Sequence, residues 1–314
     1  MKVELIAFDS MGVRSMCTYI ETKSLRIIID PSAALAPRRF GLPPHEIEIE
    51  RLNQLAKKIT EKALNADVII ITHYHYDHHD LGDLIPLDIY NNKIVMVKDP
   101  ENNINKSQKD FRAPLFLGII KQRAKSLEIA DNKVFNIEGV KIEFSKAVFH
   151  GASDLLGYVI EVMIDEDGDK VIHTSDVQGP IFEDQVEFLL KNKPRIAIID
   201  GPMIYMLGYR YSYENLDASL KNIEKLIESG IEEIILDHHM LRDRNYIYIF
   251  KNLREKYPKA KILTAAEYMG LEVDILEARR KELFNKGGNK KENMEGNDRE
   301  ENSTSSISNI RENT

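Results

Sequence analysis

The residues best suited to chemistry are concentrated in one short segment, which runs His73-Tyr-His75-Tyr-Asp77-His78-His79-Asp80. Neutral imidazole and carboxylate groups are the ligands that suit zinc and similar ions, and crowding them together is costly unless a cation holds them. On an extended segment, the H-x-H spacing places both imidazoles on the same side. The D-H pair that follows, at a turn, can then face a second ion. The segment therefore predicts a metal site.

Other candidate ligands follow other predicted strands. His150 comes after the strand predicted at 139–148, and Asp176 comes after the one at 170–175. His238 and His239 follow the strand at 232–236. Loops at strand ends are where a rigid scaffold presents functional side chains, so these residues can share one rim with the histidine segment. We interpret His173 as structural and assign no role to His45.

The elements that must position these residues are short strands interleaved with amphipathic helices. The apolar run at 67–72 reads as a buried strand and leads directly into the histidine segment. Further strands are expected at 2–8, 15–21, 25–30, 93–97, 139–148, 156–164, 170–175, 195–200 and 232–236. Helices are expected at 46–64, 101–124, 182–192, 214–229, 243–257 and 265–284. Two sheets packed face to face, with helices outside, would satisfy this pattern and give an α/β fold.

The chain divides into one domain and a tail. Residues 1–284 carry all the predicted elements. Residues 285–314 are rich in Asn, Glu, Ser and Lys and nearly devoid of large apolar side chains. Such a segment cannot bury enough surface to offset the entropy of ordering, so we expect a disordered tail without a catalytic role.

Composition narrows the class of protein. Cys17 is the single cysteine, which rules out an internal disulfide and fits a reducing compartment. No signal peptide or membrane span is apparent, so a cytoplasmic protein without membrane contact is expected. The formal net charge is -8, which argues against a general nucleic-acid binder, although a nuclease with a local basic groove stays open.

The ordered set of motifs resembles the metallo-β-lactamase superfamily over most of residues 1–280. The H-x-H-x-D-H segment, a later His, a later Asp and a final His occur in that family's order, and Ile28-Ile29-Asp30-Pro31 is similar to its "IDP" turn. The resemblance implies an αββα four-layer sandwich with a binuclear site in a cleft at its edge. One metal would be held by His73, His75 and His150, the other by Asp77, His78 and the final His, with Asp176 bridging.

The resemblance also bears on the final ligand and the metal. In related RNA-processing members a basic residue follows the terminal His after four positions, which favours His238, paired with Arg242, over His239. A histidine at position 75, where diiron oxidoreductase members typically carry an acid, favours a zinc hydrolase. Manganese and iron stay open.

The expected chemistry is hydrolysis by water activated between two divalent ions. Asp77 would orient this water, and Arg242 and the tyrosine-rich loop 205–211 are candidate substrate contacts. No G-x-S-x-G nucleophile motif is present. The expected substrate is a small ester, lactone or phosphodiester. Two alternatives are a nuclease acting on RNA or DNA, and a non-catalytic metal-binding protein.

Overall fold

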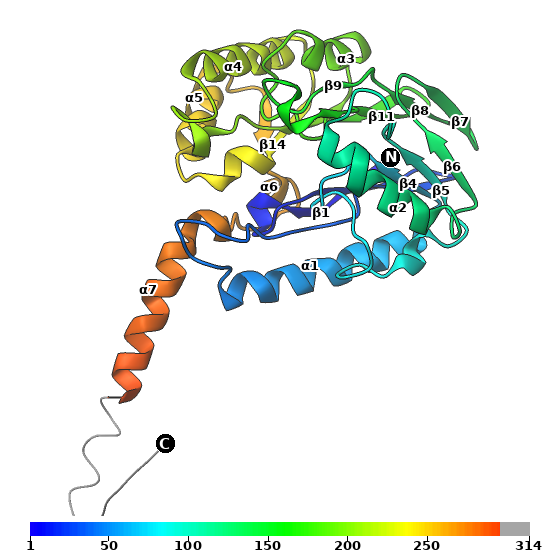
Figure 1. Cartoon of the computed structure of the whole chain (residues 1–314). Coiled ribbons are helices and arrows are strands. Elements are labelled where there is room, and N and C mark those ends of the chain that lie inside the picture. The colour runs from blue at the N-terminus through cyan, green and yellow to red at the C-terminus, as the bar shows by residue number, and fades with distance from the viewer. Residues whose placement is uncertain (296–314) are drawn as a thin grey trace, which may run out of the picture.

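The computed structural model describes residues 1–295, with side chains described through Asn285. Two β-sheets lie between two layers of helices (Figure 1). The first sheet has the order β1-β2-β3-β4-β5-β6. Its strands are β1 (Lys2–Phe8), β2 (Met16–Glu21), β3 (Arg26–Ile29), β4 (Val68–Ile71), β5 (Ile94–Val97) and β6 (Ser126–Ile129). Strands β1 to β3 pair antiparallel, whereas β3 to β6 pair parallel.

The second sheet has the order β15-β14-β13-β12-β11-β8-β7. Its strands are β7 (Val134–Ile137), β8 (Val140–Phe144), β11 (Val162–Glu166), β12 (Asp169–His173), β13 (Ile196–Asp200), β14 (Glu233–Asp237) and β15 (Lys261–Leu263). Strands β12 to β15 are parallel, and the register sets Asp200 of β13 beside Asp237 of β14. A separate hairpin joins β9 (Val148–Phe149) to β10 (Tyr158–Val159).

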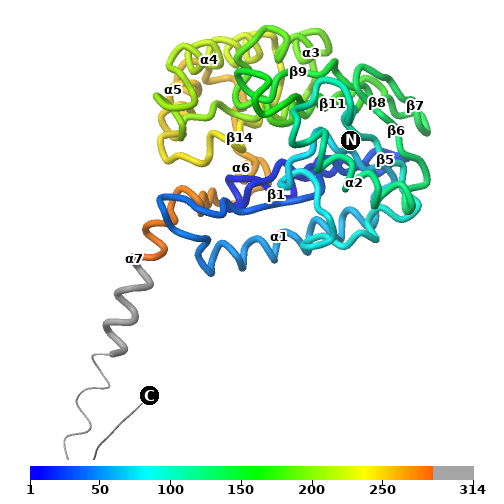
Figure 2. Tube along the Cα trace, in the orientation of Figure 1, coloured from blue at the N-terminus to red at the C-terminus, as the bar shows by residue number. Residues whose placement is uncertain are grey.

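Helices cover the two outer faces. Helix α1 (Glu46–Asn65) lies outside the first sheet, and α3 (Asp184–Asn192), α4 (Tyr213–Glu228) and α5 (Tyr246–Lys256) lie outside the second (Figures 1 and 2). The remaining helices are α2 (Ala113–Ile120), α6 (Ala265–Tyr268) and α7 (Leu276–Glu295). Among the described residues, none of the helices combines the length and apolar composition that a membrane span requires.

Alternation along the strands explains the layering. In β13, Ile196 and Ile198 belong to the core between the sheets, whereas Ala197 and Ile199 pack with the outer helices. Successive strand side chains point to opposite faces, so a strand that is apolar throughout must be covered on both sides. These observations confirm the predicted αββα sandwich.

Helix α1 shows how sequence fixes an element locally. Its N-cap is His45, whose ring accepts a hydrogen bond from the Ile47 amide, while the Glu48 carboxylate accepts one from the His45 amide. This reciprocal capping box satisfies amides that the first helical turn leaves free. Leu55, Ile59 and Ala63 form the buried stripe of the helix. Because His45 caps the first turn of this helix, it has a structural role.

Two predicted helices differ in the structure. The segment 101–124 is a turn, a π-helix (Gln108–Arg112) and the short α2, because Asp99 accepts the amides of a turn at 101–102 and Asn103 adopts a φ of 48°. The segment 265–284 is two helices, α6 and α7, because Gly270 (φ 68°) interrupts it. Residues 285–295 of the predicted tail lie in α7, and 296–314 lie outside the described residues.

Candidate metal centre

The histidine segment forms a loop directly after β4. Its chain alternates, so that Tyr74 is buried on one side and its hydroxyl donates to the Lys98 carbonyl at 2.5 Å. The imidazoles of His73 and His75 lie on the other side, with ring centroids 4.6 Å apart. The His78 amide then donates to the His75 carbonyl at 3.0 Å and turns the chain. The predicted alternation thus holds in the structure.

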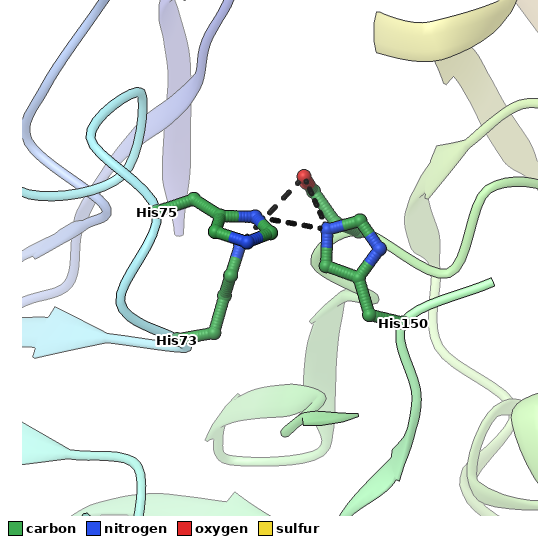
Figure 3. A group of neighbouring side chains, drawn as sticks. His73, His75 and His150 are labelled. Carbon is green, nitrogen blue, oxygen red and sulfur yellow. Dashed lines mark hydrogen bonds and ion pairs between the residues drawn. The ribbon is translucent and has the colours of Figure 1, made fainter. Parts of the chain in front are cut away.

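The first group of candidate ligands consists of His73, His75, His150 and Asp176. Figure 3 shows the three imidazoles turned toward one another. His150 Nε2 lies 3.1 Å from His75 Nδ1 and 3.3 Å from Asp176 Oδ2, and His73 Nε2 lies 3.7 Å from the same oxygen. A tetrahedral ion with ligand bonds of about 2.0–2.1 Å separates its ligand atoms by roughly 3.3 Å. The spacing of this group fits such an ion.

The second group consists of Asp77, His78, Asp176 and His238. Asp176 Oδ1 lies 3.0 Å from His78 Nε2 and 3.3 Å from His238 Nε2. Asp77 is slightly farther, with its oxygens 3.9 Å from His78 Nε2 and 3.8 Å from His238 Nε2. Because Asp176 turns one oxygen to each group, it is placed to bridge two ions.

Unpaired buried atoms support this fit. His73 Nε2, His78 Nε2 and Asp176 Oδ1 are buried and have no hydrogen-bond partner among the described residues. Although His78 Nε2 and Asp176 Oδ1 are close, they do not meet in hydrogen-bonding geometry. A buried polar group without a partner costs about 1–3 kcal/mol. Ligation of divalent cations would satisfy all three atoms.

Buried carboxylates orient the ligands of the second group from behind. His78 Nδ1 lies 2.8 Å from Asp30 Oδ2, and His238 Nδ1 lies 2.7 Å from Asp9 Oδ2. Metal-binding histidines typically donate their other ring N–H in this way, which fixes the tautomer and directs the free nitrogen to the metal. Asp30 also accepts the Thr72 amide and hydroxyl, so it ties β3 to the start of the histidine loop.

Charge differs between the two groups. Burial, followed by the neighbouring His150, lowers the pKa of His75 to about 3, so this imidazole is neutral and ready to ligate. Burial alone would lower the pKa of His78 too, but the carboxylates of Asp176 and Asp30 raise it well above its ordinary value. The same balance, with Asp176 and Asp9, raises the pKa of His238. The second group therefore attracts positive charge, which a divalent cation would supply.

His239 occupies a different place from His238. Its Nδ1 lies 2.8 Å from Asp200 Oδ2, its Nε2 lies 3.4 Å from the Gln178 amide nitrogen, and its ring stacks on Tyr205 at 6.4 Å. It also groups with Asp176 and Asp200 as possible ligands. However, two backbone amides, those of Gln178 and His239, already donate to Asp200, so we assign this carboxylate to holding His239.

A cavity of about 790 Å³ opens over both ligand groups. His75, Asp77, His150 and Asp176 reach it from the metal side. Its polar walls include Arg14, Arg112, Arg210, Arg242, Gln178 and His239, and its apolar walls include Leu35, Leu155, Leu156, Met203, Tyr205 and Met206. The predicted contacts Arg242 and loop 205–211 thus face the same space as the ligands.

Arg242 is buried and is paired rather than free. Its Nε donates to Asp9 Oδ1 at 2.8 Å, and its Nη2 lies 3.7 Å from Asp77 Oδ2 and 3.0 Å from His238 Nε2. Asp9 therefore holds both His238 and Arg242.

Asp9, Asp200 and Gln178 also belong to the site, although their roles were not predicted from the sequence. Asp9 directly follows β1 and Asp200 ends β13, so the rule that identified the ligands, an acidic residue at a strand end, would have found both. No local signal distinguishes Gln178. His173, interpreted as structural, is buried, and its Nε2 lies 3.0 Å from the Met16 carbonyl. His79 is buried as well, with Nδ1 2.9 Å from the His75 carbonyl.

Comparison with known families agrees with this architecture. The profile described as "Beta-lactamase superfamily domain" matches residues 25–206, more than half of the chain. The chain belongs to the metallo-β-lactamase superfamily, as its motifs predicted. Its relatives include the "UPF0282 protein" of Sulfurisphaera tokodaii, 50% identical over 288 residues that cover 91% of this chain and 94% of that protein. Another, from Saccharolobus solfataricus, is 51% identical over 286 residues, covering 90% and 93%.

Solved structures with the same fold are more distant. The isothiocyanate hydrolase from Delia radicum gut bacteria matches with a TM-score of 0.53 and 18% identity, over 81% of this chain and 94% of that one. A possible metal-dependent hydrolase from Veillonella parvula matches with a TM-score of 0.50 and 17% identity, over the same shares of the two chains. At such identities the likeness extends to the fold alone.

Proposed function

We propose that this protein is a hydrolase with a binuclear zinc centre, acting on a small ester, lactone or phosphodiester. The observation that carries the proposal is the position of Asp176, which turns one oxygen to each of two ligand groups that include five histidines. The two structural neighbours, an isothiocyanate hydrolase and a possible metal-dependent hydrolase, agree with it. Imidazole-rich sites of this kind suit zinc, although manganese and iron can also occupy them.

The residues have distinct roles in this proposal. His73, His75 and His150 would hold one ion, Asp77, His78 and His238 would hold the other, and Asp176 would supply a ligand oxygen to each. When bound, two divalent ions act as Lewis acids and lower the pKa of water to roughly 7.

Around the centre, the chain's own groups direct the reaction. Asp77 reaches the cavity, so its carboxylate can orient the attacking water by accepting a hydrogen bond. The Arg242 guanidinium, held by Asp9, is placed to stabilise the negative charge that develops on the substrate.

The cavity favours a small substrate. Its volume of about 790 Å³ lies within the range of about 300–1,000 Å³ typical of sites for small molecules. Its walls come from the loop at 34–37 after β3 of the first sheet, the loop at 152–156 in the β9–β10 hairpin, and the loop at 203–211 after β13 of the second sheet. A cavity of this size supports an ester, lactone or phosphodiester rather than a long nucleic-acid strand.

Metal content tests the proposal directly. Plasma mass spectrometry on tag-free, zinc-reconstituted protein should find about two equivalents of metal. Asp77→Ala and His150→Ala each remove a ligand from one group and should lower the content, whereas His45→Gln, at the cap of α1, should not. A turnover screen of phosphodiesters, lactones and esters then follows. Less than about half an equivalent in the reconstituted wild type would refute the binuclear centre and the mechanism with it.

A further inference from the structure

The arginines of the cavity are unusual for a chain whose net charge is -8. Four of them, Arg14, Arg112, Arg210 and Arg242, line the cavity, while its only lining carboxylates are the metal ligands Asp77 and Asp176 among the described residues. Once two divalent ions neutralise those carboxylates, the cavity is strongly positive. Clefts lined by one sign of charge concentrate ligands of the opposite sign.

Two of the four arginines are already paired with carboxylates that lie outside the cavity. Arg14 forms a bidentate pair with Glu277, at 2.6 and 2.7 Å, and Arg242 pairs with Asp9. Arg112 and Arg210, by contrast, form no ion pair with a carboxylate in the part of the chain whose side chains are described. Arg210 is exposed, whereas Arg112 is partly buried. Among the described side chains, Arg112 is therefore the cavity arginine that is partly buried and has no carboxylate partner.

Contacts other than ion pairs hold Arg112 in place. Its guanidinium lies over the Tyr76 ring, 4.8 Å from the centroid, and its Nη1 donates to the Tyr74 carbonyl at 3.4 Å. Both partners belong to the histidine loop. Arg112 also ends the π-helix, whose Gln108 accepts the Tyr74 amide at 2.9 Å. Single turns of π-helix occur frequently at functional sites, and here the turn fixes Arg112 relative to the metal ligands.

We infer that Arg112 binds an oxyanion of the substrate, so that the substrate of this hydrolase is an anionic ester or phosphodiester. The inference rests on the proposed function and adds the substrate class to it. A guanidinium presents paired N–H donors that match the two oxygens of a phosphoryl or carboxylate group. The apolar wall of Leu155, Leu156 and Met206 would receive the uncharged part of the same substrate.

Three substrates with the same leaving group distinguish the sources of the oxyanion. They are bis(p-nitrophenyl) phosphate, the mono-p-nitrophenyl ester of adipic acid, and neutral p-nitrophenyl butyrate. For the zinc-loaded full chain, kcat/KM divided by the rate constant of uncatalysed hydrolysis should be higher for one of the two anions than for the neutral ester. The favoured anion then identifies phosphoryl or carboxylate recognition.

Arg112→Gln removes the charge and keeps a polar side chain of similar reach. It should lower kcat/KM for the favoured anion by roughly 10- to 100-fold, the loss expected for a charge-assisted hydrogen bond, and leave the neutral ester within about twofold. Arg112→Lys should recover part of the loss. Arg38→Gln, an exposed arginine outside the cavity, should match the wild type. Equal losses for all three substrates would overturn the inference, because they would indicate a structural role.

Binding of inorganic phosphate and of acetate, measured by calorimetry on zinc-loaded wild type and Arg112→Gln, separates the inference from the proposed function. If neither anion binds more weakly to the variant, the inference fails even if the protein hydrolyses neutral esters. If one anion binds at least tenfold more weakly but no ester is hydrolysed, the oxyanion site stands and the proposed hydrolase fails.

Discussion

Asp9→Asn is expected to weaken the second metal position selectively. In the folded chain, Asp9 accepts two hydrogen bonds from charged or metal-binding groups, from His238 Nδ1 at 2.7 Å and from Arg242 Nε at 2.8 Å. Asparagine has nearly the same shape, but it offers one acceptor oxygen and one amide donor. Either His238 or Arg242 therefore faces an N–H group instead of an oxygen.

Two free-energy effects follow from this change. Loss of the carboxylate behind a metal-binding histidine typically reduces metal affinity about 10- to 100-fold, or about 1.4–2.7 kcal/mol. Arg242 is 3% exposed, so it cannot turn to solvent, and leaving a buried charge without its partner costs about 3–5 kcal/mol in the free energy of unfolding. The first group, which Asp9 does not contact, should keep its ion.

Competition between the protein and a zinc chelator measures the first effect, and urea unfolding measures the second. Asp9→Asn should release one equivalent of zinc at a 10- to 100-fold lower chelator concentration and retain the other. Asp217→Asn, which removes an exposed partner of Lys221, is the matched control and should change neither quantity by much. Folded Asp9→Asn protein that resists the chelator as the wild type does would refute the role of Asp9 in tuning His238.

Two further substitutions test the fold around the site. Glu161 is fully buried, neither of its oxygens has a partner among the described residues, and burial raises its pKa well above 4.5. The unfolded chain loses this proton at lower pH than the folded chain, so wild-type stability falls as pH rises above about 4.5. Glu161→Gln should therefore gain up to about 1.4 kcal/mol per pH unit over wild type, seen by urea unfolding between pH 5 and 7.5, and a constant difference would contradict this. Gly179 has a φ of 81°, and a Cβ there would lie 2.7 Å from Pro202 Cα; Gly41 has a φ of 79° with nothing within 4 Å. Gly179→Ala should lower the melting temperature more than Gly41→Ala, because only the first adds a clash to the backbone strain, and equal losses would contradict the clash.

The sequence predicted those parts of the molecule that depend on local patterns. Strand β4 could be identified because Val68–Ile71 is continuously apolar, and the histidine loop because its residue types have few uses other than metal binding. The helix predicted at 101–124 was wrong in its first residues. The Asn-rich segment there forms a turn, because local hydrogen bonds to side chains compete with the helix. The predicted helix at 265–284 failed at Gly270, whose positive φ separates α6 from α7.

The partners of the ligands could not be predicted because they depend on how distant segments meet. Asp9 and His238 are 229 residues apart, and nothing near either one specifies the other. Their contact follows only once β1 and β14 are placed in their sheets. The same holds for Asp30, 48 residues from His78, although the "IDP" pattern drew attention to it. The sequence therefore indicates the candidate ligands, whereas the carboxylates behind them depend on the topology of the sheets.

Backbone strain around the site supports a preorganised centre. Four non-glycine residues with positive φ, Asp30, Ser175, Gln178 and His238, lie on or beside the ligand loops, with φ between 50° and 59°. Such conformations cost of order 1–3 kcal/mol each and persist only where the surroundings fix them.

Buried carboxylates provide that fixation. Asp237 accepts the His238 amide at 2.7 Å, and Asp200 accepts the Gln178 amide at 2.7 Å. These two aspartates end neighbouring parallel strands and are paired in register. The rigid sheet edge thus offsets the strain of the loops and holds the ligand atoms apart at distances suited to metal ions.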